Sequence, residues 1–250
     1  MNVELNEKIL LARVQDAIKH TEQKGLARYL GFLDMHMRKS VQSLLNGLRF
    51  ENYCFFGGYE QAERVLIGFF PDYEKPNTEK FPISSVKISW KYGELNHRDF
   101  LGSILSLGIE RDKIGDIILN EQQCFVFAEN VMCNLILQNL TKVGGTGVSC
   151  ELADGSNVCK NQEFKEIRST IASNRLDCVV AAICNKSRSA AEDLILGAKV
   201  SVDFKQTENT SLKINMGSTI SIRQYGRFEI MEIDSLNKKD RHILLVNKYL

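Results

Sequence analysis

The sequence predicts an α+β protein with a helical N-terminal region, a mixed α/β middle domain and a smaller C-terminal domain of two helices and a sheet. Three observations indicate this class. Apolar residues recur at helical spacing near the start, alternate with polar residues at strand spacing through the middle, and do both in the last third. We place the three parts at residues 1–48, 49–155 and 173–250, with a polar linker at residues 156–172.

The N-terminal region carries two apolar stripes. They are formed by Leu5, Ile9, Leu10 and Val14, and, beyond a break at Gly25, by Leu26, Tyr29, Leu30, Leu33 and Met37. This spacing predicts two amphipathic helices that pack against each other or against the following domain. A helix that binds a protein partner would show the same pattern, but core packing is sufficient to explain it.

The middle domain interleaves strand and helix patterns. Strands are predicted at residues 53–56, 65–70, 86–90, 117–119, 124–127 and 148–152. Asn96 is expected to cap a helix, in a capping box with Asp99, and Gly108 is expected to end that helix. A second helix is predicted over residues 129–140. We therefore expect a sheet with helices on one face.

The C-terminal domain begins with a short helix whose apolar stripe is formed by Leu176, Val179, Val180 and Ile183. Ser187 is predicted to cap a second helix at residues 188–196, which Gly197 ends. Residues 200–205 and 220–223 alternate between apolar and polar side chains, which predicts two half-buried strands.

Composition limits the function of the chain. Its 250 residues, 44% of them hydrophobic and 25% charged, predict packed cores and more than one domain. The formal net charge is only +1, so binding of nucleic acid would depend on local groups of cations. Arg175 and Lys186 bracket the first C-terminal helix and Arg188 begins the second, which predicts one concentrated cationic surface there.

Several classes of protein are disfavoured. The seven cysteines include no CxxC pair, which is typical of reduced, buried thiols and predicts a cytoplasmic protein. The first residues do not resemble a signal peptide, and no apolar run approaches the roughly 18 residues of a membrane span. The four histidines lie far apart and beside no cysteine at ligand spacing, so we expect no metal site.

Three C-terminal motifs resemble the S4 domain, an RNA-binding module named for a ribosomal protein. They are RLD at residues 175–177, SRSAAEDLILGAKVSVD at residues 187–203 and YGRF at residues 225–228. The sequence departs from the S4 pattern only at the turns around residues 209–210 and 216–218. It implies that the two helices pack on RNA backbone near a helix junction or loop.

A second resemblance covers the middle domain. FGGY at residues 56–59, AER at residues 62–64 and HRDFLGSILSLGIERDKIGDI at residues 97–117 are similar to bacterial YlmH-type S4-domain proteins. These proteins have a helical N-terminus, a middle domain like an RNA-recognition motif (RRM-like) and a C-terminal S4 domain. The N-terminal region is matched weakly, because Met35 stands after Phe32-Leu33-Asp34 where a proline is expected.

The two resemblances imply a function and a set of contact residues. They imply a cytoplasmic, monomeric protein that docks on the large ribosomal subunit, contacts ribosomal RNA and peptidyl-tRNA, and helps to rescue obstructed ribosomes. We expect neither a cofactor nor a membrane partner. The candidate RNA-binding residues are Arg175, Lys186, Ser187, Arg188, Lys199, Arg223 and Arg227, with Arg98, Arg111 and Lys113 in the middle domain.

Three motifs suggest catalysis, and none is complete. HRD at residues 97–99 lacks the kinase asparagine, since Ile104 stands in that position, and GGTG at residues 144–147 lacks the lysine of a P-loop. RLD also surrounds the catalytic aspartate of pseudouridine synthases, but too little chain follows Asp177 for such a domain, so we interpret Asp177 as structural. The alternatives are an RNA-modifying enzyme with an S4 domain, and an adaptor acting in cell division or through the N-terminal helices.

Overall fold

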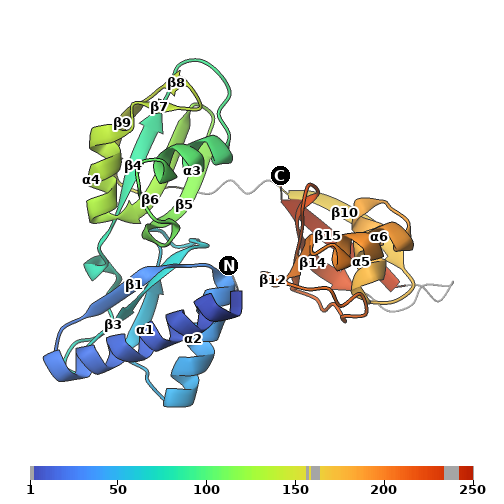
Figure 1. Ribbon diagram of the computed structural model, residues 1–250, viewed down its shortest axis with the longest axis horizontal. Helices are drawn as coiled ribbons and strands as arrows, with labels where there is room; N and C mark the ends of the chain where they lie inside the picture. The colour runs from blue at the N-terminus through green and yellow to red at the C-terminus, as the bar shows by residue number, and fades with distance from the viewer. Residues whose placement is uncertain (1–2, 156–157, 159–163, 234–241, 250) are drawn as a thin grey trace. The chain divides into compact units, whose positions relative to one another are not determined.

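The computed structural model describes residues 3–155, 158, 164–233 and 242–249, and the chain forms two compact units (Figure 1). Unit 1 is Met1–Lys160 and unit 2 is Asn161–Leu250. Unit 1 contains two main sheets, which divide it into an N-terminal part (residues 3–75) and a middle part (residues 76–155). Unit 2 is built around one larger sheet.

The N-terminal part is a three-stranded antiparallel sheet of order β1-β3-β2, against which two helices pack (Figure 1). Its elements are α1 (Val3–Lys24), β1 (Arg28–Leu33), α2 (Met35–Leu48), β2 (Tyr53–Phe56) and β3 (Val65–Phe69). The helices and the sheet share a core that includes Val14, Val41, Leu45, Ile67 and Phe69.

The helix predicted over the second apolar stripe is wrong in its first half. Arg28–Leu33 is strand β1, paired antiparallel with β3. A stretch with so few apolar residues is compatible with both the helical and the strand period. The pairing with β3 decides in favour of a strand. Gly31 permits a close approach between β1 and the middle part, because a Cβ on it would lie 2.6 Å from the backbone oxygen of Asp112. Asp34 then starts α2 by accepting a 2.9 Å hydrogen bond from the Met37 amide.

The strands predicted at residues 53–56 and 65–70 exist, but their predicted place in the sheet of the middle domain is wrong. They are β2 and β3, and both belong to the sheet that contains β1. Strand periodicity shows which side chains alternate, but it does not show with which other strand a strand pairs.

The middle part is a four-stranded antiparallel sheet of order β5-β6-β4-β9, with α3 and α4 on one face (Figure 1). Its main elements are β4 (Ile83–Ser89), α3 (His97–Leu105), β5 (Ile114–Asn120), β6 (Gln123–Glu129), α4 (Asn130–Asn139) and β9 (Ser149–Ala153). The predicted capping box of Asn96 and Asp99 is confirmed. GGTG forms the turn and second strand of a small hairpin, β7 (Lys142–Val143) and β8 (Thr146–Gly147).

A polar network joins the two parts of unit 1. The buried Asp116 carboxylate on β5 accepts hydrogen bonds from Tyr59 Oη at 2.6 Å, from the Glu63 amide at 2.7 Å and from the Arg64 amide at 3.1 Å. The Arg64 guanidinium donates to the carbonyl oxygens of Phe32 in the N-terminal part, at 2.8 Å, and of Ile114 in the middle part, at 3.1 Å. The loop between β2 and β3 is thereby fixed to the sheet of the middle part.

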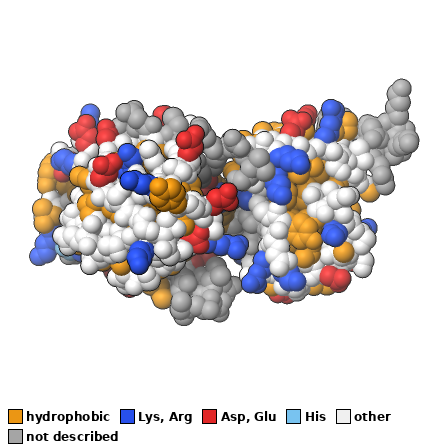
Figure 2. All heavy atoms as spheres, turned by 90° about the horizontal axis from the view of Figure 1, so that it is seen from above, with side chains coloured by type: hydrophobic (Ala, Val, Ile, Leu, Met, Phe, Trp, Pro, Cys, Tyr) orange, Lys and Arg blue, Asp and Glu red, His pale blue; other side chains and the backbone are white. Residues whose placement is uncertain are grey.

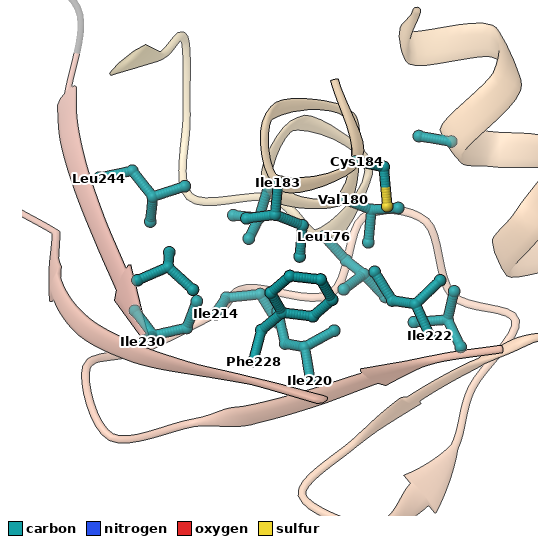
Figure 3. Packing of buried hydrophobic residues seen from close by; sticks show 14 of the residues in the cluster. Leu176, Val180, Ile183, Cys184, Ile214, Ile220, Ile222, Phe228, Ile230 and Leu244 are labelled. Atoms are coloured by element: carbon teal, nitrogen blue, oxygen red, sulfur yellow. The ribbon is translucent and has the colours of Figure 1, made fainter. Parts of the chain in front are cut away.

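Unit 2 is a six-stranded sheet of order β10-β15-β14-β13-β11-β12 with two helices. Its elements are β10 (Phe164–Ile171), α5 (Leu176–Cys184), α6 (Arg188–Leu196), β11 (Val200–Val202), β12 (Lys205–Gln206), β13 (Thr219–Ile222), β14 (Gly226–Ile233) and β15 (His242–Tyr249). Figure 3 shows Leu176, Val180 and Ile183 of α5 facing Ile220, Phe228 and Ile230 of the sheet.

The predicted linker is wrong for residues 164–171. These residues form β10, which pairs with β15 along its whole length. The polar composition that suggested a linker arises because β10 is an edge strand with mostly exposed side chains. The beginning of the predicted linker, at residues 156–157 and 159–163, lies outside the described residues.

Replacement of Phe228 by alanine should destabilise unit 2. Phe228 is buried in the core between α5 and the sheet, and loss of a buried phenyl ring costs about 3–5 kcal/mol. Hydrogen exchange followed by mass spectrometry should show faster exchange of the α5 amides. Met231→Ala is the matched control, because Met231 lies on the same strand with 40% of its surface exposed and should change little. Equal protection of α5 in Phe228→Ala and Met231→Ala would contradict this account of the core.

Candidate nucleic-acid interface

A buried carboxylate at the start of α5 holds two arginines. Asp177 is fully buried, and it accepts hydrogen bonds from Arg175 Nη2 at 2.9 Å and from Arg188 Nη2 at 2.6 Å. The Nε groups of Arg175 and Arg188 donate to the same carboxylate at 3.2 and 3.0 Å. We call Arg175, Asp177 and Arg188 the arginine–aspartate cluster. It confirms that Asp177 pairs with neighbouring cations.

The cluster keeps all three groups charged. Burial by itself would raise the pKa of Asp177, but hydrogen bonds from Arg175, Arg188 and the Cys178 amide outweigh it and lower this pKa from 3.8 to about 2. The hydrogen bonds to Asp177 in turn raise the pKa of Arg175 and Arg188. One negative charge therefore orients two positive charges.

Both guanidinium groups remain accessible. The side chain of Arg175 is 38% exposed and that of Arg188 is 54% exposed, although Arg188 also lies 3.5 Å from Glu192. An arginine carries five N–H donors, so each side chain keeps donors that Asp177 does not use. Such oriented donors match the geometry of a phosphate group.

The turn between α5 and α6 adds further polar groups next to the cluster. Asn185 adopts a left-handed conformation with φ of 51°, Lys186 is exposed, and Ser187 caps α6 by accepting a 3.2 Å hydrogen bond from the Ala190 amide. This cap was predicted. Because Ser187 uses its hydroxyl oxygen as a cap, it can offer its hydrogen to a ligand.

Sequence reasoning missed two cations of this region. Lys213 is exposed and forms an isolated β-bridge with Arg175, which brings it beside the cluster. Lys248 on β15 lies close enough to Cys184 to act with Lys186 against the burial that raises the Cys184 pKa to about 11. Lys213 lies between two short elements, and Lys248 lies on a strand beyond the last motif, so no pattern near either residue indicates the site.

Two other candidates of unit 2, Lys199 and Arg223, lie apart from the cluster. Lys199 and Arg223 are neighbours, joined by a 2.9 Å hydrogen bond from the Arg223 amide to the Lys199 carbonyl. They lie beyond the end of α6 opposite to Arg188, and a helix of 9 residues separates these ends by about 13 Å.

Arg227 lies on the other face of the sheet. Its neighbour Phe228 points into the core, and successive side chains of a strand point to opposite faces. The Arg227 guanidinium lies over the rings of Phe204 and Tyr249, with its central carbon 5.1 and 5.2 Å from their centroids. Figure 2 shows that lysine and arginine side chains predominate over acidic ones on the visible face of unit 2.

The three candidates of the middle part differ in their accessibility. Arg98 is exposed in the first turn of α3. Arg111 Nη1 donates to the Ile114 carbonyl at 2.6 Å, and burial, together with nearby Arg64, lowers the pKa of Arg111 to about 10. Lys113 forms a 2.9 Å ion pair with Glu129. Arg111 and Lys113 thus already have partners within the protein.

Two further observations concern the described residues alone. They include no group of three or more histidine, cysteine, aspartate or glutamate side chains that could hold a metal ion. None of the helices in the described part of the chain is long and apolar enough to cross a membrane.

Comparison with known proteins identifies the family. A family model described as "Putative RNA-binding domain in YlmH" matches residues 76–157. The chain is 30% identical over 213 residues to the Ribosome-associated protein quality control protein P2 of Bacillus subtilis, and the match covers 84% of this chain and 82% of that protein. The chain belongs to the YlmH family.

A solved structure has a similar fold. The Cell division protein ylmH from Streptococcus pneumoniae superposes with a TM-score of 0.54 at 24% identity, covering 62% of this chain and 94% of that chain. The mixed α/β class predicted from the sequence is therefore confirmed.

The arginine–aspartate cluster should make the stability of unit 2 depend on pH. A depressed carboxylate pKa contributes stability that is present above the unfolded value near 3.8 and is lost as the pH falls towards 2. Because both arginines are partly exposed, we expect this contribution to be on the order of 1–2 kcal/mol. In urea unfolding at pH 6, the free energy of unfolding should be larger for wild type than for Asp177→Asn. This difference in free energy should shrink between pH 4 and pH 2. A difference that stays constant over this range would contradict the ionised, paired state of Asp177.

Proposed function

We propose that the chain is a cytoplasmic RNA-binding protein that docks on structured RNA of the large ribosomal subunit and acts in the quality control of obstructed ribosomes. The observation that carries this proposal is the arginine–aspartate cluster, which presents two oriented guanidinium groups at the start of two adjacent helices. The name of the Bacillus subtilis relative and the description of the matched family model support the same function.

We assign unit 2 as an S4 domain and the middle part as an RRM-like domain. Support for the S4 assignment comes from the two helices packed on a sheet and from the position of the RLD and SRS motifs at the helix starts. Support for the RRM-like assignment comes from the chain order β4-α3-β5-β6-α4-β9, in which β4 and β6 are central strands of an antiparallel sheet with both helices on one face.

The cluster would bind RNA backbone. Phosphate groups would accept hydrogen bonds from the free donors of Arg175 and Arg188, while Lys186, Lys213 and Lys248 would add positive potential around them. Because Asp177 already orients both side chains, little side-chain entropy would be lost on binding. Such contacts recognise the shape and the backbone of an RNA and not its base sequence. They are therefore suited to folded ribosomal RNA.

The remaining parts of the proposal follow from this mode of binding. The protein would act as a monomer and without catalysis, by occupying a site on the subunit beside peptidyl-tRNA. The middle part would supply a second contact with RNA. Lys199 and Arg223, at the far end of α6, would contact phosphate groups farther along the same RNA.

Salt dependence of binding tests the role of the cluster. Arg188→Ala should weaken binding to large-subunit RNA by tenfold or more and reduce the salt slope by about one, because one phosphate contact is lost. Arg188→Lys should restore charge without the planar pair of donors, so its affinity should lie between those of wild type and Arg188→Ala.

Arg168→Ala is the matched control for this test. Arg168 is exposed on β10, next to core-facing Ile167, so it lies on the sheet face away from α5 and α6. Its loss changes the net charge by the same amount. If Arg168→Ala weakened binding as much as Arg188→Ala, the affinity would depend on total charge and the assignment of the cluster would be wrong.

A further inference from the structure

The open face of the sheet in the middle part is partly covered by the chain itself. Phe127 on β6 points to the face away from α3 and α4, and Tyr59 lies over it with ring centroids 4.8 Å apart and an interplanar angle of 30°. Gly58, with φ of 99°, permits this contact, since a Cβ there would lie 2.5 Å from the Phe127 ring. The Phe127 ring is therefore covered and is not available to stack on a base.

Most cations of the middle part have partners. Lys80, Lys87 and Lys113 form ion pairs with Glu74, Glu151 and Glu129. Arg111 donates to backbone carbonyl oxygens. The other three cations between residues 76 and 155 are Lys91, Arg98 and Lys142, which are exposed and form no ion pair with any residue that the structure describes.

These three cations lie on segments that pack together at one end of the middle part. Lys91 lies in the loop after β4, Arg98 in the first turn of α3 and Lys142 on β7, which packs against α3. A Cβ on Gly93 would lie 3.4 Å from Thr146 Oγ1, and a Cβ on Gly144 would lie 3.2 Å from Leu95, so the loop touches the hairpin. Figure 2 views unit 1 from this end and shows basic, acidic and apolar side chains intermixed there.

An exposed aromatic ring stands in the same loop. Tyr92 is 82% exposed, and its backbone is fixed by a tight turn in which Trp90 Nε1 donates to the Gly93 carbonyl at 3.1 Å. Proteins bind single-stranded nucleic acids with this kind of arrangement, a large exposed ring on a fixed loop beside cations. The bases stack on the ring, and the phosphate groups contact the cations.

The local acids do not neutralise this surface by pairing with its cations. Asp99 accepts a hydrogen bond from the Asn96 amide in the capping box of α3, and Glu94 is exposed in the loop. Because Asn96 and Asp99 cap α3, the attraction for phosphate comes from the three side chains and not from the helix end.

We propose that Lys91, Tyr92, Arg98 and Lys142, called the Tyr92 surface, form a second RNA site that binds a single-stranded segment. A base stacks on the ring of Tyr92, and the flanking phosphates contact the three cations. The inference rests on the proposed RNA-binding function and deepens it, since it assigns the form of RNA and the residues of the middle part. A single strand is favoured because a duplex would keep its bases stacked on each other.

Two RNAs and the full-length chain test the proposal. Binding of a fluorescein-labelled single-stranded 12-mer of adenosines is measured beside binding of a blunt 12-base-pair duplex. Tyr92→Ala should weaken binding of the single strand about tenfold, with no change for the duplex, and Tyr92→Phe should retain the wild-type affinity because the ring remains.

The cations are tested with a charge-matched pair of triple variants. Lys91→Gln/Arg98→Gln/Lys142→Gln should weaken binding of the single strand and lower its salt slope by about two. Arg13→Gln/Lys80→Gln/Lys87→Gln removes the same charge from ion-paired positions and should have a much smaller effect.

Three results would overturn the proposal: no binding of the single strand by wild type, wild-type affinity in Tyr92→Ala, or equal losses in the two triple variants. If Tyr92→Ala lost ribosome binding but kept its affinity for the single strand, the proposal would also be overturned, because the surface would then bind a protein partner. Arg188→Ala is measured in parallel on large-subunit RNA, so failure of the Tyr92 surface and failure of the arginine–aspartate cluster can be told apart.

Discussion

The arrangement of unit 2 depends on one buried carboxylate. Asp177 lies in the first turn of α5, and its partners come from the residue before that helix and from the first residue of α6. It therefore fixes the relative position of the two helix starts and at the same time orients the two guanidinium groups. A buried charge without partners is very costly, so the buried Asp177 requires the two arginines. The tripeptide RLD, which could suggest catalysis, is explained by this pairing.

The sequence predicted local structure better than it predicted partners. The cap at Ser187, the capping box at Asn96 and the apolar stripe of α5 were all confirmed, because each depends on residues only a few positions apart. Strand β1, the sheet that contains β2 and β3, and the pairing of β10 with β15 were missed, because they depend on contacts between distant segments. The candidate site followed the same rule. The motifs indicated Arg175 and Arg188, whereas Lys213 reaches the site only through the fold.

The structure also explains motifs whose roles the sequence left open. In FGGY, Gly57 permits a close approach to Arg64, since a Cβ on it would lie 2.4 Å from the Arg64 backbone oxygen. Gly58, with a positive φ, permits the close approach to Phe127. Arg64 in AER joins the two parts of unit 1, and Asp116 near the end of the long middle motif accepts the bonds that hold this loop. These motif residues thus hold unit 1 together.

The central claim is that Asp177 acts on RNA binding by orienting two arginines, and Asp177→Asn tests it most directly. This substitution removes one negative charge, so the formal net charge of the chain rises by one from +1. Attraction by charge alone would therefore make RNA binding tighter. Affinity for large-subunit RNA should be measured at pH 7 and moderate salt, after hydrogen exchange has shown that α5 and α6 remain folded. The account predicts weaker binding in spite of the added charge. Equal or tighter binding by the folded Asp177→Asn variant would contradict it.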